Sequence, residues 1–406
     1  MPGNGMPREI RRRLYAFARG VARPFADSRR RAFLADMVAG MTIAGHVHLS
    51  KIARAISRGD TRIHGVEKKL SKHLGSEHWD MSAVADDLLQ RSARMVNDDT
   101  LIAGDLTDLG KPYARKLEGL GRVHDGSDPD KRIVAGYMVF EAYVRVGKWQ
   151  MFPLLLEPLQ TYSGAPTSEN AEISAHVLRI QQATEGKGTW VLDRGFDRDE
   201  LMLPWLRKSL AFVVRQRGDR HVLLTDGRKR SVNDAATELR PAAWPRRWPK
   251  DGYTTSRQVC LPEAPDQPLL LVVHWRWPGS TEPLLLLVSP AARRRNRTAR
   301  WFVKAYHKRW GVEDATWSIK QRFSVEGFLV RTWRAIRRLL WLVGWVFYWL
   351  NLWGNDHYER LLQALLDHPW RLPKEVIYLG DWIALQIGHL LHPKPILRLR
   401  EEVNTG

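Results

Sequence analysis

Four residues on one short segment combine an acid, two cations and a phenol: Tyr306, Arg309, Glu313 and Lys320. Relative to Tyr306, the other three follow at offsets of three, seven and fourteen residues. At about 100° per residue, these offsets place all four side chains within roughly 60° on one helical face. Such a stripe is unsuited to a core but suits a phosphodiester, because the acid can hold a metal ion and the cations can bind phosphate oxygens.

Two aspartates far upstream each follow an apolar run that predicts a strand. The first predicted strand, 100–106, carries Asp105, and the second, 189–192, is followed directly by Asp193. Gly104 would allow a close approach of the backbone beside the first acid. Acids at the carboxyl ends of strands can converge on one edge of a mixed α/β sheet. We therefore expect both aspartates at strand ends, meeting at such an edge.

These acids suit phosphodiester cleavage by two metal ions. Carboxylates can hold two Mg²⁺ ions about 4 Å apart, and the ions clamp the attacking and leaving oxygens. Three well-placed acids suffice, because Mg²⁺ prefers oxygen ligands and retains several waters. The candidate ligands are Asp105, Asp193 and Glu313, with Mn²⁺ able to substitute for Mg²⁺, and Asp314 is an alternative third acid. Each acid alone also has an ordinary interpretation, as a turn, a cap or a solvated helix face.

The chain is strongly basic. Its 406 residues include 64 Lys and Arg against 44 Asp and Glu, which gives a net charge of +20. Positive charge on this scale suits a polyanion, of which nucleic acid is the commonest. The alternative is a generically basic protein from an arginine-rich genome. With 44% hydrophobic residues the chain can bury a core, and its length predicts two or three domains.

Cysteine usage and hydropathy indicate a reducing compartment. The single cysteine, Cys260, excludes a disulfide framework and a cysteine-based zinc site. The N-terminus is arginine-rich and lacks the features of a secretion signal. The apolar run 339–353 is about five residues shorter than a bilayer span, so we expect a buried core helix there. The sequence therefore predicts a cytoplasmic protein without a membrane partner.

Residues 1–97 read as helices with basic faces and form a candidate DNA-binding region. Within 48–74, short apolar periods alternate with Lys and Arg, and Gly59-Asp60 interrupts the pattern. Two short helices flanking a turn would suit a helix-turn-helix-like reader of DNA. A basic helical bundle that makes no groove contact is the alternative.

The remainder predicts an α/β catalytic core divided by an insertion. Residues 98–217 contain three strands and then a helix at 169–183, a strand, a second helix and a last strand, which predicts a mixed sheet. Residues 218–298 are rich in Pro, Trp and Arg with two strongly β-like runs, and we interpret them as a β-rich insertion. Residues 299–356 complete the core with the helix that carries Glu313, and residues 357–406 form a helical C-terminal region.

The helical stripe resembles the signature of a family of bacterial DDE transposases, the IS-four family of insertion sequences: Tyr306-x2-Arg309-x3-Glu313-x6-Lys320. The segments that begin with Asp105-Leu-Thr and Asp193-Arg-Gly-Phe resemble the two aspartate motifs of that family. The similarity covers about residues 98–330, and the β-rich insertion also fits.

What the resemblance implies is an RNase H-like fold with a β-strand insertion and the activity of a cut-and-paste DNA transposase. Asp105, Asp193 and Glu313 would ligate two Mg²⁺ ions. A water would nick the terminal inverted repeat and free a 3′ hydroxyl, which attacks the opposite strand and makes a hairpin. A second water would open the hairpin, and the 3′ end would then join target DNA.

The resemblance also assigns DNA contacts and partners. Tyr306, Arg309 and Lys320 would hold phosphates near the cleaved or flipped terminus. Trp275 and Trp277 of the insertion are candidates for stacking on a flipped base, although a strand aromatic is more often part of a core. The partners would be transposon-end and target DNA, with a homodimer in the synaptic complex of a nucleoid-associated bacterial protein.

Two other functions stay open at the level of sequence. One is a non-enzymatic DNA-binding protein derived from a transposase, which would keep the basic surface and lose catalysis. The other is another RNase H-like DNA endonuclease, which would need the same acids but not the Tyr-Arg-Lys stripe. Strand-transfer products would separate the endonuclease from a transposase.

Overall fold

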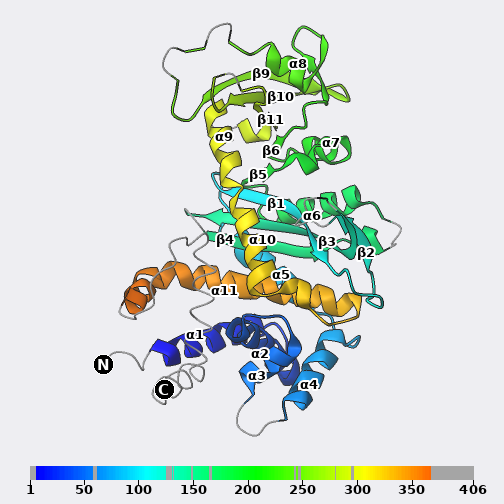
Figure 1. Cartoon of the computed structure of the whole chain (residues 1–406), viewed down its shortest axis with the longest axis vertical. Helices are drawn as coiled ribbons and strands as arrows, with labels where there is room; N and C mark the ends of the chain where they lie inside the picture. The colour runs from blue at the N-terminus through cyan, green and yellow to red at the C-terminus, as the bar shows by residue number, and fades with distance from the viewer. Residues whose placement is uncertain are drawn as a thin grey trace.

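A long mixed sheet joins a β-rich end of the molecule to a helical end (Figure 1). The structure is a computed structural model of the chain. It describes residues 6–57, 62–124, 130, 132–147, 150–163, 167–241, 244–245, 248–278, 280–293 and 297–366. Within these ranges, side chains are described for residues 9–353.

Eleven strands of the described chain form one sheet. In chain order they are β1 (Leu101–Gly110), β2 (Gly121–His124), β3 (Ile133–Val146), β4 (Gln150–Pro158), β5 (Thr189–Leu192), β6 (Phe212–Arg215), β7 (His221–Leu224), β8 (Lys229–Ser231), β9 (Tyr253–Leu261), β10 (Ala264–Trp275) and β11 (Leu284–Val288). Their spatial order is β2-β3-β1-β5-β6-β11-β10-β9-β7-β8, and β4 also pairs with β3. The fold is therefore mixed α/β with one large sheet.

The centre of the sheet combines antiparallel and parallel pairs. β1 is antiparallel to β3, and β3 is antiparallel to β4. On its other side β1 is parallel to β5, and β5 is parallel to β6. All four residues of β5 are buried, as expected for a central parallel strand with helices on both faces. Two helices make the crossovers: α6 (Glu169–Ala183), which Ser168 caps through its hydroxyl, and α7 (Asp199–Arg207).

The strands of the predicted insertion extend this central sheet. β11 pairs antiparallel with β6, and β10, β9 and β7 follow outward. The short helix α8 (Val232–Thr237) lies at this end of the molecule (Figure 1). Edge-to-face contacts link Trp244 to Trp248, Tyr253 and Trp275, so these aromatic rings pack together at this end of the main hydrophobic core.

The other end of the molecule is helical. Its helices are α1 (Met6–Val21), α2 (Ser28–Ala44), α3 (Leu49–Ile56), α4 (Ile63–Gly75) and α5 (Ser82–Ala93). The long helix α11 (Trp333–Leu366) runs between this group and the sheet, contacting β4 on one side and α2 on the other (Figure 1). Gly59-Asp60, the predicted turn between two DNA-reading helices, lies outside the described residues, as do residues 367–406 of the predicted C-terminal region.

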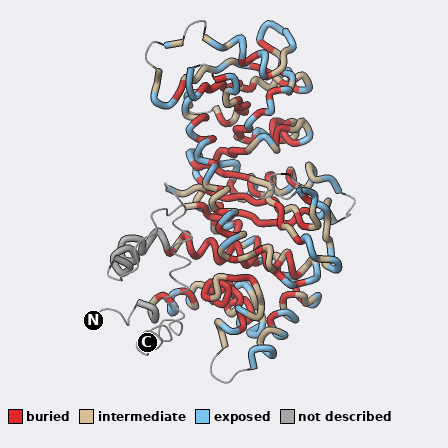
Figure 2. The backbone as a smooth tube through the Cα atoms, in the orientation of Figure 1, coloured by how far each residue is buried: buried red, intermediate tan, exposed pale blue. Residues whose placement is uncertain are grey.

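The apolar run 339–353 belongs to α11 and is buried, as its sequence predicts (Figure 2). Among the described residues no single helix is both long and apolar enough to cross a membrane. Only α2 and α3 taken together reach such a composition, and they bend by 97° at the break between them.

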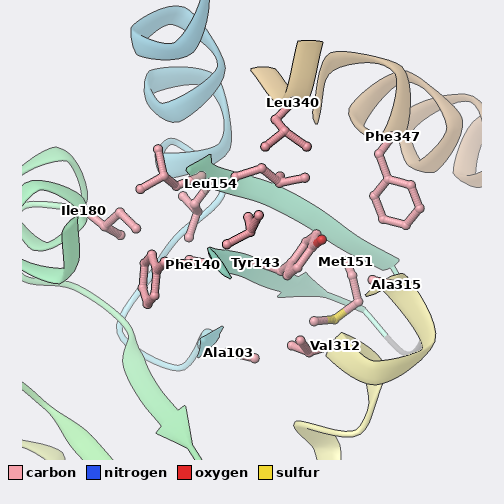
Figure 3. Close-up of a cluster of buried hydrophobic side chains, with 14 of the residues drawn as sticks. Ala103, Phe140, Tyr143, Met151, Leu154, Ile180, Val312, Ala315, Leu340 and Phe347 are labelled. Carbon is pink, nitrogen blue, oxygen red and sulfur yellow. The ribbon is translucent and has the colours of Figure 1, made fainter. Parts of the chain in front are cut away.

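Two helices lie across the sheet between its β-rich and helical ends: α9 (Ala299–Lys308) and α10 (Gly311–Arg322). Figure 3 shows Val312 and Ala315 of α10 turned toward Met151 of β4 and Ala103 of β1. Val312, Ala315 and Met151 are fully buried. This apolar contact seats the predicted signature helix on the strand that carries Asp105.

Candidate active site

Asp105 and Asp193 occupy equivalent positions on neighbouring strands. In the parallel pair β1–β5, Leu101 lies opposite Thr189 and Ala103 opposite Val191, an offset of 88 residues (189 − 101). The two aspartates have the same offset (193 − 105 = 88) and lie two residues beyond the last paired position. Because parallel neighbours are about 4.8 Å apart, the register brings these carboxylates together at one sheet edge.

The expectation that Asp105 ends its strand is wrong. β1 continues to Gly110, and Asp105 lies in its middle. The physical reason is strand pairing, because β3 accompanies β1 along its whole length whereas β5 stops at Leu192. Asp105 therefore lies just beyond the point where β5 ends beside β1. Among the described residues, the side of β1 that faces β5 has no paired strand there, although β1 itself continues.

Asp193 turns the chain away from the sheet. Its Oδ1 accepts a hydrogen bond of 2.7 Å from the amide of Gly195, and the residue caps a short 3₁₀ turn, Arg194–Phe196. A Cβ at position 195 would lie 2.9 Å from that same Oδ1. Glycine at this position therefore leaves space for the aspartate side chain.

A single continuous helix from Tyr306 to Lys320 was expected, and the structure differs. α9 ends at Lys308 and α10 begins at Gly311. At the junction, the amides of Arg309 and Val312 bond to carbonyls three residues back, those of Tyr306 at 3.0 Å and Arg309 at 2.8 Å. Such bonds tighten the backbone locally. A glycine opens the second helix where a Cβ would lie 3.1 Å from the sulfur of Met151.

Arg309 bridges two of the three predicted ligands. Its Nη1 lies 3.1 Å from Oδ2 of Asp105, and its Nη2 lies 2.5 Å from Oε1 of Glu313. Its side chain is only 7% exposed. Burial alone would lower the pKa of Arg309, but the charges around it, above all that of Asp105, raise it. The guanidinium is therefore firmly cationic and is held by the carboxylates.

The three acids interact electrostatically. Desolvation raises the pKa of Asp105 to about 6, against the opposing effect of Arg309. Asp193 and Glu313 each raise it further. Asp314 has a different environment, in which desolvation and Glu313 raise its pKa and Arg145 lowers it. Of the two neighbouring acids Glu313 and Asp314, Glu313 is therefore the one that binds the same arginine as Asp105.

The other two members of the stripe have partners of different kinds. Lys320 lies 3.2 Å from Oδ1 of Asp108 and 3.4 Å from Oε1 of Glu326. Tyr306 is buried in a small hydrophobic cluster, with its ring 5.8 Å from the Arg309 guanidinium carbon. Lys320 therefore reaches toward the same strand as Arg309, while Tyr306 supports the guanidinium by packing.

A fourth acid, missed by the sequence analysis, lies beside Asp105. Glu141 of β3 is paired with Asp105 in the antiparallel register and is 2% exposed. Desolvation raises its pKa to about 8, the charge of Asp105 adds to this, and the hydroxyls of Thr316 and Tyr143 oppose it. The available signal was a lone glutamate within the apolar run of β3.

The tryptophans near the site divide by exposure. Trp275 is 2% exposed and packs against Trp244 and Tyr253, whereas Trp277 is 54% exposed. Two further exposed rings lie seven residues apart at the signature segment, Trp310 at the α9–α10 junction and Trp317 on α10. Of the two predicted stacking candidates, Trp277 is the one whose ring faces solvent.

The donor set fits a hard cation, but Arg309 lies among the donors. Asp105, Asp193 and Glu313 offer carboxylate oxygens, the ligands that Mg²⁺ prefers. Within the described ranges, no three acidic, histidine or cysteine side chains are arranged to hold a metal ion as they stand. The guanidinium between Asp105 and Glu313 supplies the positive charge there, so a metal ion held by both acids would have to replace Arg309 as their partner.

Known families and curated proteins offer no further guide. No protein-family model matches this chain, and no curated protein matches it.

Proposed function

We propose that this chain is a DDE transposase of the IS-four type, which catalyses cut-and-paste transposition of an insertion sequence. One observation carries the proposal: the common 88-residue offset of the β1–β5 register and of Asp105 and Asp193. That offset brings two acids to the same edge, and Arg309 links the first of them to Glu313. Phosphodiester chemistry with two metal ions needs such a convergence of acids from distant segments.

The proposal includes an RNase H-like catalytic core. Its support is the strand order β4-β3-β1-β5-β6, antiparallel on one side of β1 and parallel on the other. In chain order α6 follows β4, α7 follows β5, and the α9–α10 pair comes after β6 and the strands β7 to β11. The strands β7 to β11 would then be the insertion between the second and third acids.

In the proposed site, Asp105, Asp193 and Glu313 would hold two Mg²⁺ ions, which when bound stabilise the attacking and leaving oxygens of the scissile phosphate. Arg309 and Lys320 would leave their carboxylate partners and bind phosphate oxygens, as charge-assisted bonds favour. Tyr306 would keep the Arg309 side chain in place by packing. Trp277, or an exposed tryptophan on the signature segment, would stack on an unpaired base.

The reaction would comprise successive in-line displacements at phosphorus. A water oxygen forms a bond to the end phosphate, the bond to the 3′ oxygen breaks, and a 3′ hydroxyl is released. That hydroxyl attacks a phosphate of the opposite strand, which closes the transposon end as a hairpin and releases a 3′ hydroxyl on the flanking DNA. A second water breaks the hairpin bond and restores the 3′ hydroxyl of the end. This hydroxyl finally attacks a phosphate of target DNA and displaces a target 3′ hydroxyl. Two transposon ends require two active sites, so the working assembly would be a homodimer on DNA in the bacterial nucleoid.

The test uses DNA that carries the inverted repeats bounding this reading frame. With Mg²⁺ or Mn²⁺ the wild type should nick the repeat ends, form hairpins and join 3′ ends to target DNA. D105A, D193A and E313A should each abolish cleavage while retaining DNA binding in a gel-shift assay. D314N is the matched control, since it changes the neighbouring acid on the same helix, and it should still cleave.

Each alternative has its own result. Undiminished cleavage by any one of the three alanine variants would refute the proposed triad. Cleavage without strand transfer would indicate an endonuclease, and binding without cleavage by the wild type would indicate a non-enzymatic DNA-binding protein.

A further inference from the structure

A buried polar contact joins β3 to α10 next to the proposed triad. Glu141 lies across the β1–β3 ladder from Asp105. Its Oε1 accepts a hydrogen bond from the hydroxyl of Thr316, and its Oε2 accepts one of 2.9 Å from the hydroxyl of Tyr143. Both carboxylate oxygens are therefore engaged by hydroxyls, one of them on the helix that carries Glu313.

Thr316 lies on α10 between Glu313 and Lys320, so a contact at Thr316 affects the placement of both of these side chains. It follows Glu313 by three residues and precedes Lys320 by four, so the three side chains share one face. Apart from Thr316 and Lys320, α10 packs on the sheet through apolar residues such as Val312 and Ala315 (Figure 3). Apolar contacts are not directional and tolerate a slide of the helix, whereas a hydrogen bond defines its position.

Among the described residues, the signature segment contacts the strands through the polar side chains of Arg309, Thr316 and Lys320, and the contacts of the two cations must open in the proposed reaction. Arg309 binds Asp105, and Lys320 binds Asp108. Both cations are needed for phosphates, and Asp105 is needed for the metal ion. The link between Glu141 and Thr316 uses no group that the chemistry requires, so it can persist when DNA and metal are bound.

We propose that Glu141 is a positioning residue. Its hydrogen bond with Thr316 prevents α10 from sliding along the sheet and so keeps Glu313 next to Asp105 and Asp193. The inference rests on the proposed function. It assigns Glu141 an action through the helix rather than a role as a fourth metal ligand. A hydrogen-bonding side chain of the same shape should therefore replace it, and an apolar one should not.

The experiment measures Mn²⁺ binding to the full-length protein by electron paramagnetic resonance in the absence of DNA, with D105A defining the signal of the site. We expect E141L and T316V to weaken Mn²⁺ binding about tenfold or more, as loss of supporting contacts does in other metal sites. E141Q and T316S keep the hydrogen-bonding groups and should stay within about twofold of the wild type.

Glu157 supplies the matched control. It is equally buried, at 3% exposed, on the neighbouring strand β4, but its carboxylate binds Arg337 and Trp341 of α11. E157L should therefore destabilise the protein and leave Mn²⁺ affinity within about twofold. Hydrogen exchange gives a second readout, because E141L and T316V should speed exchange of the α10 amides and E157L should not.

The results distinguish a failure of the positioning role of Glu141 from a failure of the proposed function. Wild-type Mn²⁺ affinity and wild-type α10 exchange in T316V would overturn the positioning role, and T316V decides the matter if E141L fails to fold. Equal weakening in E141Q and E141L would also overturn it, since a direct ligand would then be indicated. If D105A binds Mn²⁺ as the wild type does, the proposed function fails, while the exchange measurement still tests the contact.

Discussion

At the scale of single residues, the site is organised around a buried arginine rather than around its acids. Arg309 contacts Asp105 and Glu313 directly, and the negative charge of Asp193 also raises the pKa of Arg309. Three carboxylates close together would repel one another without a cation among them. The guanidinium therefore keeps the acids together in this structure, and under the proposed function it would have to move when metal ions and DNA bind.

Removal of Arg309 should show how far the folded protein depends on this cation to offset the repulsion among the carboxylates. R309A leaves Asp105 without its opposing cation, and loss of one partner of a buried pair costs about 3 kcal/mol. We expect a lower melting temperature without metal, and a larger rise on adding Mg²⁺ than in the wild type. Arg300 pairs with Asp251 at 2.7 Å on the surface, so R300A is the control and should cost about 1 kcal/mol or less. A Mg²⁺ response in R309A equal to that of the wild type would contradict the expectation.

Glu141 should also make stability depend on pH. Its pKa is about 8 in the folded protein, against 4.5 as the ordinary value. The raised pKa means that the folded state binds the proton more tightly, so this stabilisation is complete below pH 4.5 and is lost as the pH rises toward 8. E141Q cannot titrate, so its melting temperature should fall less than that of the wild type between pH 5 and pH 8. Parallel curves for the two proteins would exclude this contribution of Glu141.

At the scale of elements, the close contact of β1 with β5 sets the separation of the two aspartates. A Cβ at Gly104 would lie 2.9 Å from the Cδ2 of Leu192 and 3.3 Å from the ring of Trp190. A larger residue therefore has to displace the side chains of Trp190 and Leu192, and Leu192 directly precedes Asp193. A similar close fit, at Gly311 against Met151, helps to seat α10 on β4.

A substitution at this glycine should affect stability and metal binding together. G104A should cost about 1–3 kcal/mol through overpacking and weaken Mn²⁺ binding, because Asp105 and Asp193 are displaced relative to each other. G20A in α1 is the control, since no atom lies within 4 Å of its added Cβ and alanine favours a helix. Denaturant unfolding and Mn²⁺ titration measure the two effects. G104A with unchanged Mn²⁺ affinity would show that this strand contact does not set the site.

At the scale of the whole molecule, the net charge of +20 should dominate association with DNA. Six to ten phosphate contacts would reduce affinity by about 10³–10⁵-fold between 50 and 200 mM salt. Binding of nonspecific duplex DNA, followed by fluorescence anisotropy across this range, checks the slope. D105A should give the same slope as the wild type. Salt-independent binding would argue against a phosphate-contacting surface.

Much of the local structure could be predicted from the sequence. The predicted helix at 169–183 and the predicted strand at 189–192 have the bounds of α6 and β5, because a capping serine and a compact apolar run mark them. The buried helix at 339–353 was also confirmed, since its apolar run is too short to span a bilayer. Helical periodicity also anticipated the contacts of Arg309 with Glu313 and with the ring of Tyr306, although the expected single helix is interrupted between Lys308 and Gly311.

Only the tertiary structure decided how these residues meet. The end of β1 depends on its partner β3, which supplies hydrogen bonds as far as Gly110, and no pattern within β1 itself encodes that partner. The insertion of Arg309 between Asp105 and Glu313 joins segments about 200 residues apart, as does the contact of Thr316 with Glu141. Sequence periodicity reports the faces of individual elements, whereas the register between elements comes from packing and strand pairing across the whole fold.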